Sequence, residues 1–173
     1  GSTTINSNGG VDEFNVGSFA GLWDTSESFV DRTYEVINEN GYVDFISSLL
    51  TVNGGAQDDV LNVDDTRDSA NNVGFLTNSS ITGLDMGVGI NYNEFETLNI
   101  DLGSGDDTLN IQSTHGGVTT IEMRAGNDTV NVGSGSPNMP DIANTANISL
   151  INTEGNVNAI DGLVEMLAKI ADF

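Results

Sequence analysis

The stretch that decides the fold runs from Leu98 to Val132 and reads LNIDLGSGDDTLNIQSTHGGVTTIEMRAGNDTVNV. It contains one pattern twice: an apolar strand, a Gly-rich turn, two acidic or amide residues, and a strand with Asn between two apolar residues. The acidic positions Asp107 and Asp128 lie 21 residues apart (128 − 107). If 21 residues make one turn of a coiled β-structure, the two acidic turns stack on one another.

The same acidic turn occurs at two further places in the chain. Its aspartates are Asp12, Asp59, Asp107 and Asp128, with gaps of 47, 48 and 21 residues (59 − 12, 107 − 59, 128 − 107). These gaps are close to one or two multiples of roughly 21–24 residues, the coil length of a right-handed parallel β-helix. The sequence therefore predicts an all-β fold, a right-handed parallel β-helix or β-roll solenoid.

A longer internal repeat supports a solenoid. Residues Thr3–Gly17 and Thr119–Gly133 are identical at eight of 15 positions, at an offset of 116 residues. Tyr34–Gly41 resembles Ile148–Gly155 at an offset of 114 residues. Long self-similarity of this kind is typical of arrays and solenoids. The chain is predicted to hold about one and a half copies of a repeat of about 115 residues.

Three segments follow from this interpretation. Residues 1–2 are expected to be a cloning scar, and residues 3–160 the solenoid. Residues 161–173 have apolar residues at helical spacing after Asp161, which predicts a capping helix. The repeat alignment gives an alternative, because it places this segment opposite residues 48–53, which read as a strand. The helix is the favoured prediction.

The strands that follow the acidic turns have the form apolar–Asn–apolar. Alternation along a strand places the apolar pair inside and the Asn outside. If the coils are in register, the outward Asn residues form an amide ladder. The alternative is that each Asn is simply solvated, and the sequence favours this alternative because it does not prove the register.

The charge of the chain limits its partners. There are 26 acidic and 4 basic residues, for a net charge of −22. Such a chain lacks the basic surface that nucleic acid requires, and it is unsuited to anionic membranes and acidic polysaccharides. No apolar run is long enough for membrane insertion, and no signal peptide is present. An apolar content of 37% favours a folded chain over a disordered one.

The acidic residues point to divalent cations. Cysteine is absent, which excludes disulfides and zinc-thiolate sites. Carboxylate and carbonyl oxygens are hard ligands and select Ca²⁺ or Mg²⁺. Neutralisation of the carboxylates by bound cations is therefore the expected compensation for the charge.

One motif resembles a known family. Residues Gly54–Asn62, GGAQDDVLN, differ by one substitution, Gln57, from the calcium-binding nonapeptide G-G-x-G-x-D-x-U-x of RTX proteins. The chain is similar to the RTX-like repeats of very large secreted or surface-anchored bacterial proteins, including adhesins. The resemblance implies bound calcium and an extracellular or cell-surface location. It also implies neighbouring repeats of the same parent chain as partners, and surface glycans as a further class of partner.

In the RTX family, aspartates and carbonyls from one turn share an ion with the turn stacked beside it. The resemblance therefore implies that Asp106 and Asp107 share calcium with Asn127 and Asp128. Further implied calcium positions are Asp12, Asp58, Asp59, Gly103, Gly105 and Gly126. RTX repeats follow one another every nine residues and these do not, so few ions are expected.

Two alternatives concern the acidic residues. Asp and Asn also stabilise turns by hydrogen bonding to the backbone, without any ion. A second acidic loop, Asp64–Asp68, contains Arg67, which favours an ordinary ion pair there over a metal site.

His115 is the only histidine. The sequence shows no nucleophile or acid partner for it, so it is expected to be an exposed loop residue.

The sequence favours a non-enzymatic structural, calcium-binding module of a stalk or adhesin. The main alternative is a carbohydrate-active or carbohydrate-binding parallel β-helix domain, although fold alone does not confer function. An ice- or mineral-binding face is a third hypothesis. Its outward Thr row includes Thr108 and Thr129 but is interrupted at Glu13 and Val60.

Overall fold

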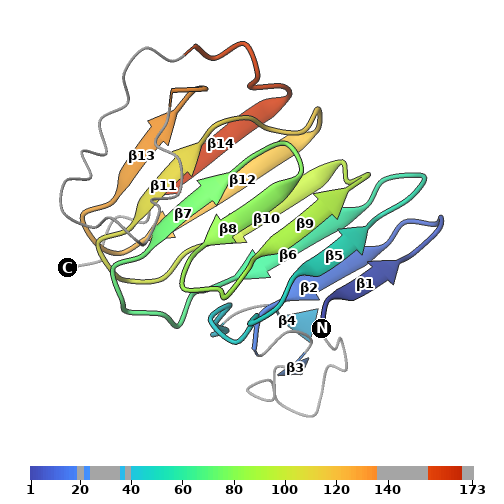
Figure 1. Ribbon diagram of the computed structural model, residues 1–173, viewed down its shortest axis with the longest axis horizontal. Helices are drawn as coiled ribbons and strands as arrows, with labels where there is room; N and C mark the ends of the chain where they lie inside the picture. The colour runs from blue at the N-terminus through green and yellow to red at the C-terminus, as the bar shows by residue number, and fades with distance from the viewer. Residues whose placement is uncertain (19–21, 24–35, 38–39, 136–155, 169–173) are drawn as a thin grey trace, which may run out of the picture.

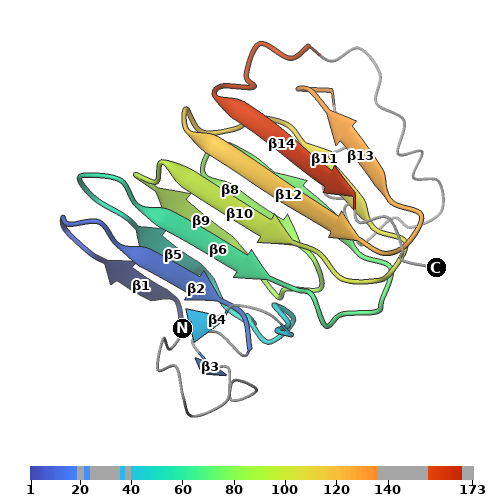
Figure 2. The same cartoon turned by 180° about the vertical axis from the view of Figure 1, so that it is seen from behind.

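The computed structural model shows a chain that passes back and forth between two facing β-sheets (Figures 1 and 2). It describes residues 1–18, 22–23, 36–37, 40–135 and 156–168. These residues form fourteen strands and no helix. A short antiparallel pair, β3 (Leu22–Trp23) with β4 (Val36–Ile37), lies outside the two sheets.

The first sheet has seven strands, in the order β1-β5-β9-β8-β7-β11-β13. Their bounds are Thr3–Asn6 (β1), Leu50–Asn53 (β5), Ile90–Asn93 (β9), Ser80–Gly83 (β8), Val73–Leu76 (β7), Thr108–Ile111 (β11) and Thr129–Val132 (β13). β8 pairs antiparallel with both of its neighbours, and the remaining pairs are parallel.

The second sheet has five parallel strands, in the order β14-β12-β10-β6-β2. Their bounds are Leu163–Ala168 (β14), Val118–Arg124 (β12), Thr97–Asp101 (β10), Val60–Asp64 (β6) and Glu13–Val16 (β2). The first residues of neighbouring strands are 47, 37, 21 and 45 residues apart (60 − 13, 97 − 60, 118 − 97, 163 − 118).

The predicted fold class is therefore wrong. A right-handed parallel β-helix or β-roll with 21–24 residues per coil needs equal coils, and the strand spacing here is irregular. The two sheets also differ in width, seven strands against five, so the described strands do not form a closed, uniform solenoid. A solenoid would place the strands between Val73 and Asn93 in successive coils. They instead form three neighbouring strands of one sheet.

Local turn chemistry explains this departure. Between β7 and β8, the backbone N–H of Thr77 donates to the carbonyl of Ser80 at 2.9 Å and closes a tight reversal. Between β8 and β9, Leu84 and Asp85 adopt left-handed φ angles of 50° and 53°. These two reversals keep three consecutive strands in one sheet.

The predicted C-terminal helix is also wrong. Residues Leu163–Ala168 form β14, which pairs in parallel with β12, and residues 169–173 lie outside the described residues. The alternative from the repeat alignment is confirmed, since Leu50 of β5 and Val164 of β14 are equivalent positions (offset 114). A neighbouring strand edge offers a ladder of backbone hydrogen bonds, and this pairing outweighs the helical spacing of the apolar residues.

The core lies between the sheets and follows the strand alternation. In β10, Leu98 and Ile100 are buried and face inward, while Asn99 between them is partly exposed. Leu61 of β6 pairs with Leu98, Ile121 of β12 pairs with Ile100, and both are fully buried, as is Leu109 of β11 in the facing sheet. The inward faces of the two sheets thus form one continuous apolar core.

The internal repeat is preserved in strand pairing. Thr3 pairs with Leu50 in the first sheet, and Thr119 pairs with Val164 in the second. These two pairings are equivalent in the sequence alignment, but they lie in opposite sheets, because one repeat contains an odd number of passes between sheets. The second matching pair of segments, 34–41 and 148–155, lies largely outside the described residues.

Outward Asn residues form hydrogen-bonded rows along both sheets. Asn62 Nδ2 donates to Asn15 Oδ1 at 3.0 Å, and Asn99 Nδ2 donates to Asn62 Oδ1 at 2.8 Å. In the other sheet, Asn131 Nδ2 donates to Asn110 Oδ1 at 2.9 Å. The preference for simple solvation is therefore wrong, because the parallel register places each Asn directly beside the next.

Candidate metal centre

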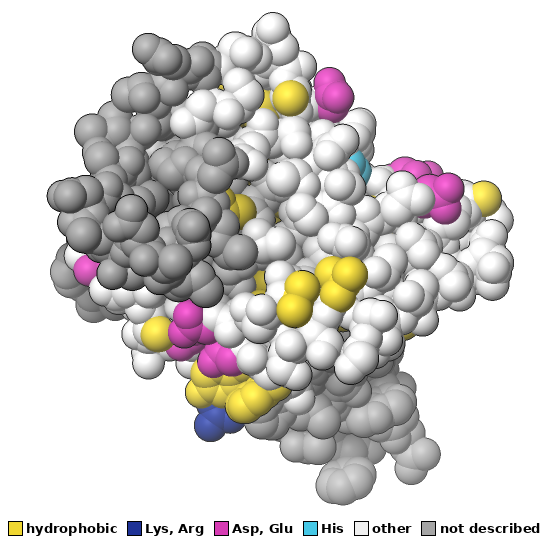
Figure 3. Space-filling view, in the orientation of Figure 1, with side chains coloured by type: hydrophobic (Ala, Val, Ile, Leu, Met, Phe, Trp, Pro, Cys, Tyr) yellow, Lys and Arg dark blue, Asp and Glu magenta, His cyan; other side chains and the backbone are white. Residues whose placement is uncertain are grey.

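The structure separates the predicted calcium residues into two groups. Asp12, Asp58 and Asp59 lie in turns that lead from the seven-stranded to the five-stranded sheet. The pairs Asp106–Asp107 and Asn127–Asp128 lie in turns that lead back, at the opposite end of the strands. In Figure 3 the acidic side chains gather near the rim of the visible face rather than over the sheet.

The turns containing Asp107 and Asp128 stack, because Thr108 pairs with Thr129. The backbone N–H of Asp107 donates to Asp128 Oδ1 at 2.9 Å, and the N–H of Asn127 donates to Asp106 Oδ1 at 2.8 Å. Asp107 Oδ1 in turn accepts the N–H of Asn72 at 2.8 Å. These carboxylates therefore connect each turn to the turn stacked beside it, because they accept hydrogen bonds from its backbone N–H groups.

The stacked turns approach one another closely at three glycines, Gly103, Gly105 and Gly126. A Cβ on Gly126 would lie 2.0 Å from the carbonyl oxygen of Gly105, and a Cβ on Gly105 would lie 1.9 Å from the carbonyl oxygen of Ala70. The motif glycines thus have a packing role that does not require an ion.

The turn at the other end repeats the carboxylate pattern. The backbone N–H of Asp12 donates to Asp59 Oδ1 at 2.8 Å, and the N–H of Asp59 donates to Glu96 Oε2 at 2.8 Å. Asp59 is fully buried, and its Oδ2 has no hydrogen-bond partner among the described residues. Asp58, next in sequence, is exposed and does not share this buried position.

Three other aspartates come closest to a metal centre. Asp44 lies in the loop before β5, and Asp65 and Asp68 lie in the loop between β6 and β7. One carboxylate oxygen of each lies within 4.8 Å of the others. Within the described part of the chain, this is the only group of three potential metal-ligating side chains at such distances. We call these three residues the aspartate trio.

The aspartate trio is largely buried. Asp65 is 1% exposed and Asp68 7%. Asp44 Oδ1 is buried and has no hydrogen-bond partner among the described residues. Asp65 Oδ1 accepts the backbone N–H of Val43 at 3.1 Å, and Asp68 Oδ1 accepts that of Ala70 at 2.8 Å. Each carboxylate therefore keeps oxygen lone pairs that protein donors do not use.

Burial and mutual repulsion disfavour the charged forms of two members of the trio, Asp65 and Asp44. Burial raises the pKa of Asp65 to about 8. The N–H of Val43 opposes this rise, while the carboxylates of Asp68 and Asp44 add to it. Burial also raises the pKa of Asp44, and the nearby carboxylate of Asp68 raises it further. A proton or a cation is therefore needed to hold the trio together near neutral pH.

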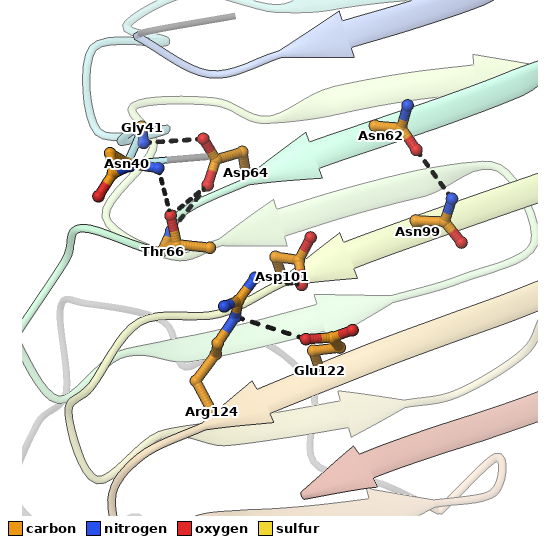
Figure 4. A network of polar contacts seen from close by, with 9 residues as sticks. All are labelled: Asn40, Gly41, Asn62, Asp64, Thr66, Asn99, Asp101, Glu122 and Arg124. Atoms are coloured by element: carbon orange, nitrogen blue, oxygen red, sulfur yellow. Dashed lines mark hydrogen bonds and ion pairs between the residues drawn. The ribbon is translucent and has the colours of Figure 1, made fainter. Parts of the chain in front are cut away.

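Neighbouring hydrogen bonds fix the two loops that carry the trio. Gly41 N–H donates to Asp64 Oδ2 at 2.7 Å, and the Thr66 hydroxyl donates to Asp64 Oδ1 at 2.7 Å (Figure 4). Asn40 N–H donates to the Thr66 oxygen at 2.7 Å. Arg67 in this loop places its guanidinium over the Tyr42 ring at 5.6 Å, and the ordinary ion pair expected for this loop stays a prediction.

Sequence reasoning missed the trio because its members come from two loops far apart in the chain. Asp44 is separated from Asp65 by an entire strand passage, β5 and β6. Only the parallel stacking of these layers brings the two loops together. The available signal was the density of acidic residues in the sequence Asp64–Asp68, which that reasoning assigned to ion pairing.

On β12, an arginine side chain rather than a metal ion lies beside two acidic side chains. Figure 4 shows Arg124 beside Asp101 and Glu122, with N–O distances of 3.2 and 3.6 Å. Burial raises the pKa of Asp101 to about 6; Arg124 opposes this rise, and Glu122 adds to it. An arginine thus balances this acidic pair, whereas none of the described ion pairs involves the aspartate trio.

His115 is partly buried rather than exposed. Its ring packs edge-on against Tyr92 at 6.0 Å, and Nδ1 lies 3.3 Å from the Thr119 hydroxyl. Burial lowers the pKa of His115, while the neighbouring Glu96 opposes this. These contacts give the histidine a packing role.

Comparisons with family models, with curated proteins and with solved structures found no match. The resemblance to RTX-like repeats therefore rests on the motif alone. Among the described residues, no helix has the length and apolar character to cross a membrane.

Proposed function

We propose that the chain is a non-enzymatic structural module of a large extracellular or cell-surface protein, stiffened by Ca²⁺ at the aspartate trio. One observation carries the proposal: Asp44, Asp65 and Asp68 converge within 4.8 Å, and Asp44 presents a buried carboxylate oxygen with no partner among the described residues. A buried acceptor without a partner costs about 1–3 kcal/mol, and more when charged.

The spacing suits calcium. Ca²⁺ binds oxygens at about 2.3–2.6 Å, so two ligands on opposite sides of one ion lie about 5 Å apart. Mg²⁺ requires shorter bonds and stricter octahedral geometry. Three carboxylates supply half of a calcium coordination sphere, and water completes it.

The ion would join two loops that are far apart in the sequence. Asp44 precedes β5, while Asp65 and Asp68 connect β6 to β7. Calcium then takes the place of the proton that burial otherwise imposes on Asp65. Three protein ligands predict an affinity in the range of extracellular calcium modules, about 10⁻⁴–10⁻³ M. An affinity in this range would suit the proposed extracellular location, where calcium is millimolar.

Calorimetry tests the proposal. We expect millimolar CaCl₂ to raise the melting temperature relative to chelator, because a ligand that binds only the folded state stabilises it. The double variant Asp65→Asn/Asp68→Asn should lose this increase. Asp161→Asn, at an exposed aspartate at the opposite end of the strands, provides the matched control and should retain it.

Two results would contradict the proposal. Equal melting temperatures in calcium and chelator would exclude calcium stabilisation. A calcium response lost in Asp107→Asn/Asp128→Asn but kept in Asp65→Asn/Asp68→Asn would move the ion to the stacked acidic turns.

A polar pocket favours neutral glycans as a second candidate function. The pocket has a volume of about 420 Å³ and is lined by Asn6, Asn8, Asn53, Gly55, Asn93 and Glu94. Asn53 Nδ2 donates to Asn6 Oδ1 at 2.6 Å, so the amides form an ordered row. Amide rows suit sugar hydroxyls, which both donate and accept hydrogen bonds. Titration with neutral oligosaccharides, with Asn93→Ala as the variant, tests this function.

A further inference from the structure

Asparagine followed by glycine occurs at three places in the chain: Asn8–Gly9, Asn40–Gly41 and Asn53–Gly54. Asparagine is a labile residue, because the backbone nitrogen of the next residue can attack its side-chain amide. Glycine at that next position favours the attack, since it has no Cβ to hinder the approach. The sequence makes the three pairs alike in this respect, and the fold distinguishes them.

At two of the pairs, the attacking nitrogen is held by a hydrogen bond. The N–H of Gly41 donates to Asp64 Oδ2 at 2.7 Å, and the N–H of Gly54 donates to the carbonyl of Asn93 at 3.0 Å. Both glycines are buried. A Cβ on Gly41 would lie 2.5 Å from Asp64 Oδ2, and a Cβ on Gly54 would lie 2.1 Å from the carbonyl oxygen of Glu94. These two backbones therefore lack both the free nitrogen and the space that ring closure requires.

Gly9 differs from the other two glycines in both respects. Its N–H has no hydrogen-bond acceptor among the described residues, and both Asn8 and Gly9 are exposed. The nearest atom to a Cβ on Gly9 would be the carbonyl oxygen of Ala56, at 3.9 Å. The nitrogen of Gly9 is therefore free to approach the side chain of Asn8.

Asn40 is a natural comparison within the same chain. Asn8 and Asn40 are both exposed, and both have left-handed φ angles, of 76° and 64°. Exposure and backbone conformation therefore do not separate them. The difference lies in the glycine that follows, whose nitrogen is bound to a carboxylate at Gly41 and is without an acceptor among the described residues at Gly9.

We propose that Asn8 is a site of spontaneous deamidation, and that the fold protects Asn40 and Asn53. The nitrogen of Gly9 forms a bond to Cγ of Asn8, and the bond between Cγ and Nδ2 breaks. The side-chain nitrogen leaves as ammonia, together with the proton that Gly9 loses. Water then opens the five-membered ring at either carbonyl, which leaves aspartate or isoaspartate at this position. Water is the only co-reactant.

The modification changes the chemistry of the polar pocket. Asn8 lines this pocket together with Asn6, Asn53 and Glu94. The product adds a carboxylate to a lining that already contains Glu94, and the net charge changes from −22 to −23 (−22 − 1). The inference lies beyond the calcium proposal and does not depend on it, because Asn8 and the aspartate trio lie in turns at opposite ends of the strands.

Peptide mapping by mass spectrometry tests the proposal. The full chain is incubated in mildly alkaline buffer made with heavy-oxygen water, so that each aspartate formed by hydrolysis carries a mass label. Digestion with pepsin in acid then stops the reaction and resolves the three sites. We expect deamidation of Asn8 to be faster than that of Asn40 or Asn53 by at least an order of magnitude.

Two variants and an unfolded sample separate the effect of the sequence from that of the fold. Gly9→Ala should slow deamidation of Asn8 by about an order of magnitude, because the methyl group hinders the attack and yet fits the open space around Gly9. Gly116→Ala, at another exposed glycine where nothing lies within 4 Å of the added Cβ, should leave the rate at Asn8 unchanged. In concentrated urea, the three asparagines should deamidate at similar rates.

Three results would overturn the proposal. The first is equal rates at the three asparagines of the folded protein. The second is an intact Asn8 in the folded protein after a time in which the urea-unfolded protein has lost this amide. The third is the same preference for Asn8 in urea, which would assign it to the sequence. The Asp65→Asn/Asp68→Asn variant should deamidate at Asn8 at the unchanged rate, so failure of the calcium proposal is distinguishable from failure of this one.

Discussion

Carboxylates in this protein have two distinct roles, and hydrogen bonding separates them. Asp107 and Asp128 connect adjacent layers by accepting backbone N–H groups. Asp44, Asp65 and Asp68 instead face one another with oxygens that protein donors do not fully use. In the second arrangement, burial and the neighbouring carboxylates disfavour the charged forms of Asp65 and Asp44, so a proton or a cation is required.

The raised pKa of Asp65 predicts a pH-dependent stability. This pKa is about 8 in the folded protein against 3.8 ordinarily, so the folded state keeps a proton that the unfolded state releases. The stability contributed by this proton is fully present below about pH 4 and is lost as pH rises toward 8. In chelator, we expect the free energy of unfolding, measured by urea titration, to fall from pH 5 to pH 8.

Two comparisons check this assignment. Asp65→Asn should flatten the dependence on pH, because the amide does not titrate. Calcium should also reduce the fall, since the cation replaces the proton. An unchanged slope in Asp65→Asn would assign the effect to other carboxylates.

Close packing of two stacked turns makes Gly126 sensitive to substitution. Its φ angle is +140°, and an added Cβ would lie 2.0 Å from the Gly105 carbonyl oxygen. We expect Gly126→Ala to lower the free energy of unfolding by about 1–3 kcal/mol because of backbone strain and displacement. Gly116→Ala, where nothing lies within 4 Å of the added Cβ, should change it little. Equal effects of the two substitutions would refute close layer packing at Gly126.

Strands in this protein are positioned by register as much as by their own sequence. Leu163–Ala168 has helical spacing of apolar residues, yet it pairs with β12 as β5 pairs with β1. β8 is placed by two tight reversals rather than by a coil. Pairing with an existing strand edge thus outweighs local periodicity.

The Asn rows should be sensitive to charge. Asn62 Nδ2 donates both to Asn15 Oδ1 and to Glu13 Oε1, each at 3.0 Å. Asn62→Asp removes this donor and places a negative charge next to Glu13. We expect a loss of about 1 kcal/mol in the free energy of unfolding. Asn91→Asp, at an exposed position of β9, is the matched control, and a loss as large there would show that the row contributes nothing specific.

The whole molecule carries far more acidic than basic charge, and its compact state is correspondingly self-repelling. In chelator, we expect the melting temperature to rise as NaCl increases, because screening weakens this repulsion. The rise should be smaller in saturating calcium, which has already neutralised part of the charge. A salt response that is identical in calcium and chelator would show that little of the charge is compensated by calcium.

The sequence by itself determined the strands that follow the acidic turns, the stacking of Asp107 on Asp128 and the strong anionic character. These are local or periodic properties: alternation of apolar residues, turn chemistry and composition are all readable within short windows. It also indicated the alignment of Leu163–Ala168 with β5, although helical spacing was weighted more strongly.

Only the tertiary structure decided the sheet widths, the β7–β8–β9 reversals, the pairing of β14 and the aspartate trio. Each depends on which strand edge lies beside which, and that choice is made by competition between pairings across the whole chain. Asp44 meets Asp65 and Asp68 for this reason alone: two loops far apart in sequence are carried to the same end of adjacent layers. No local sequence pattern predicts that these two loops lie close together.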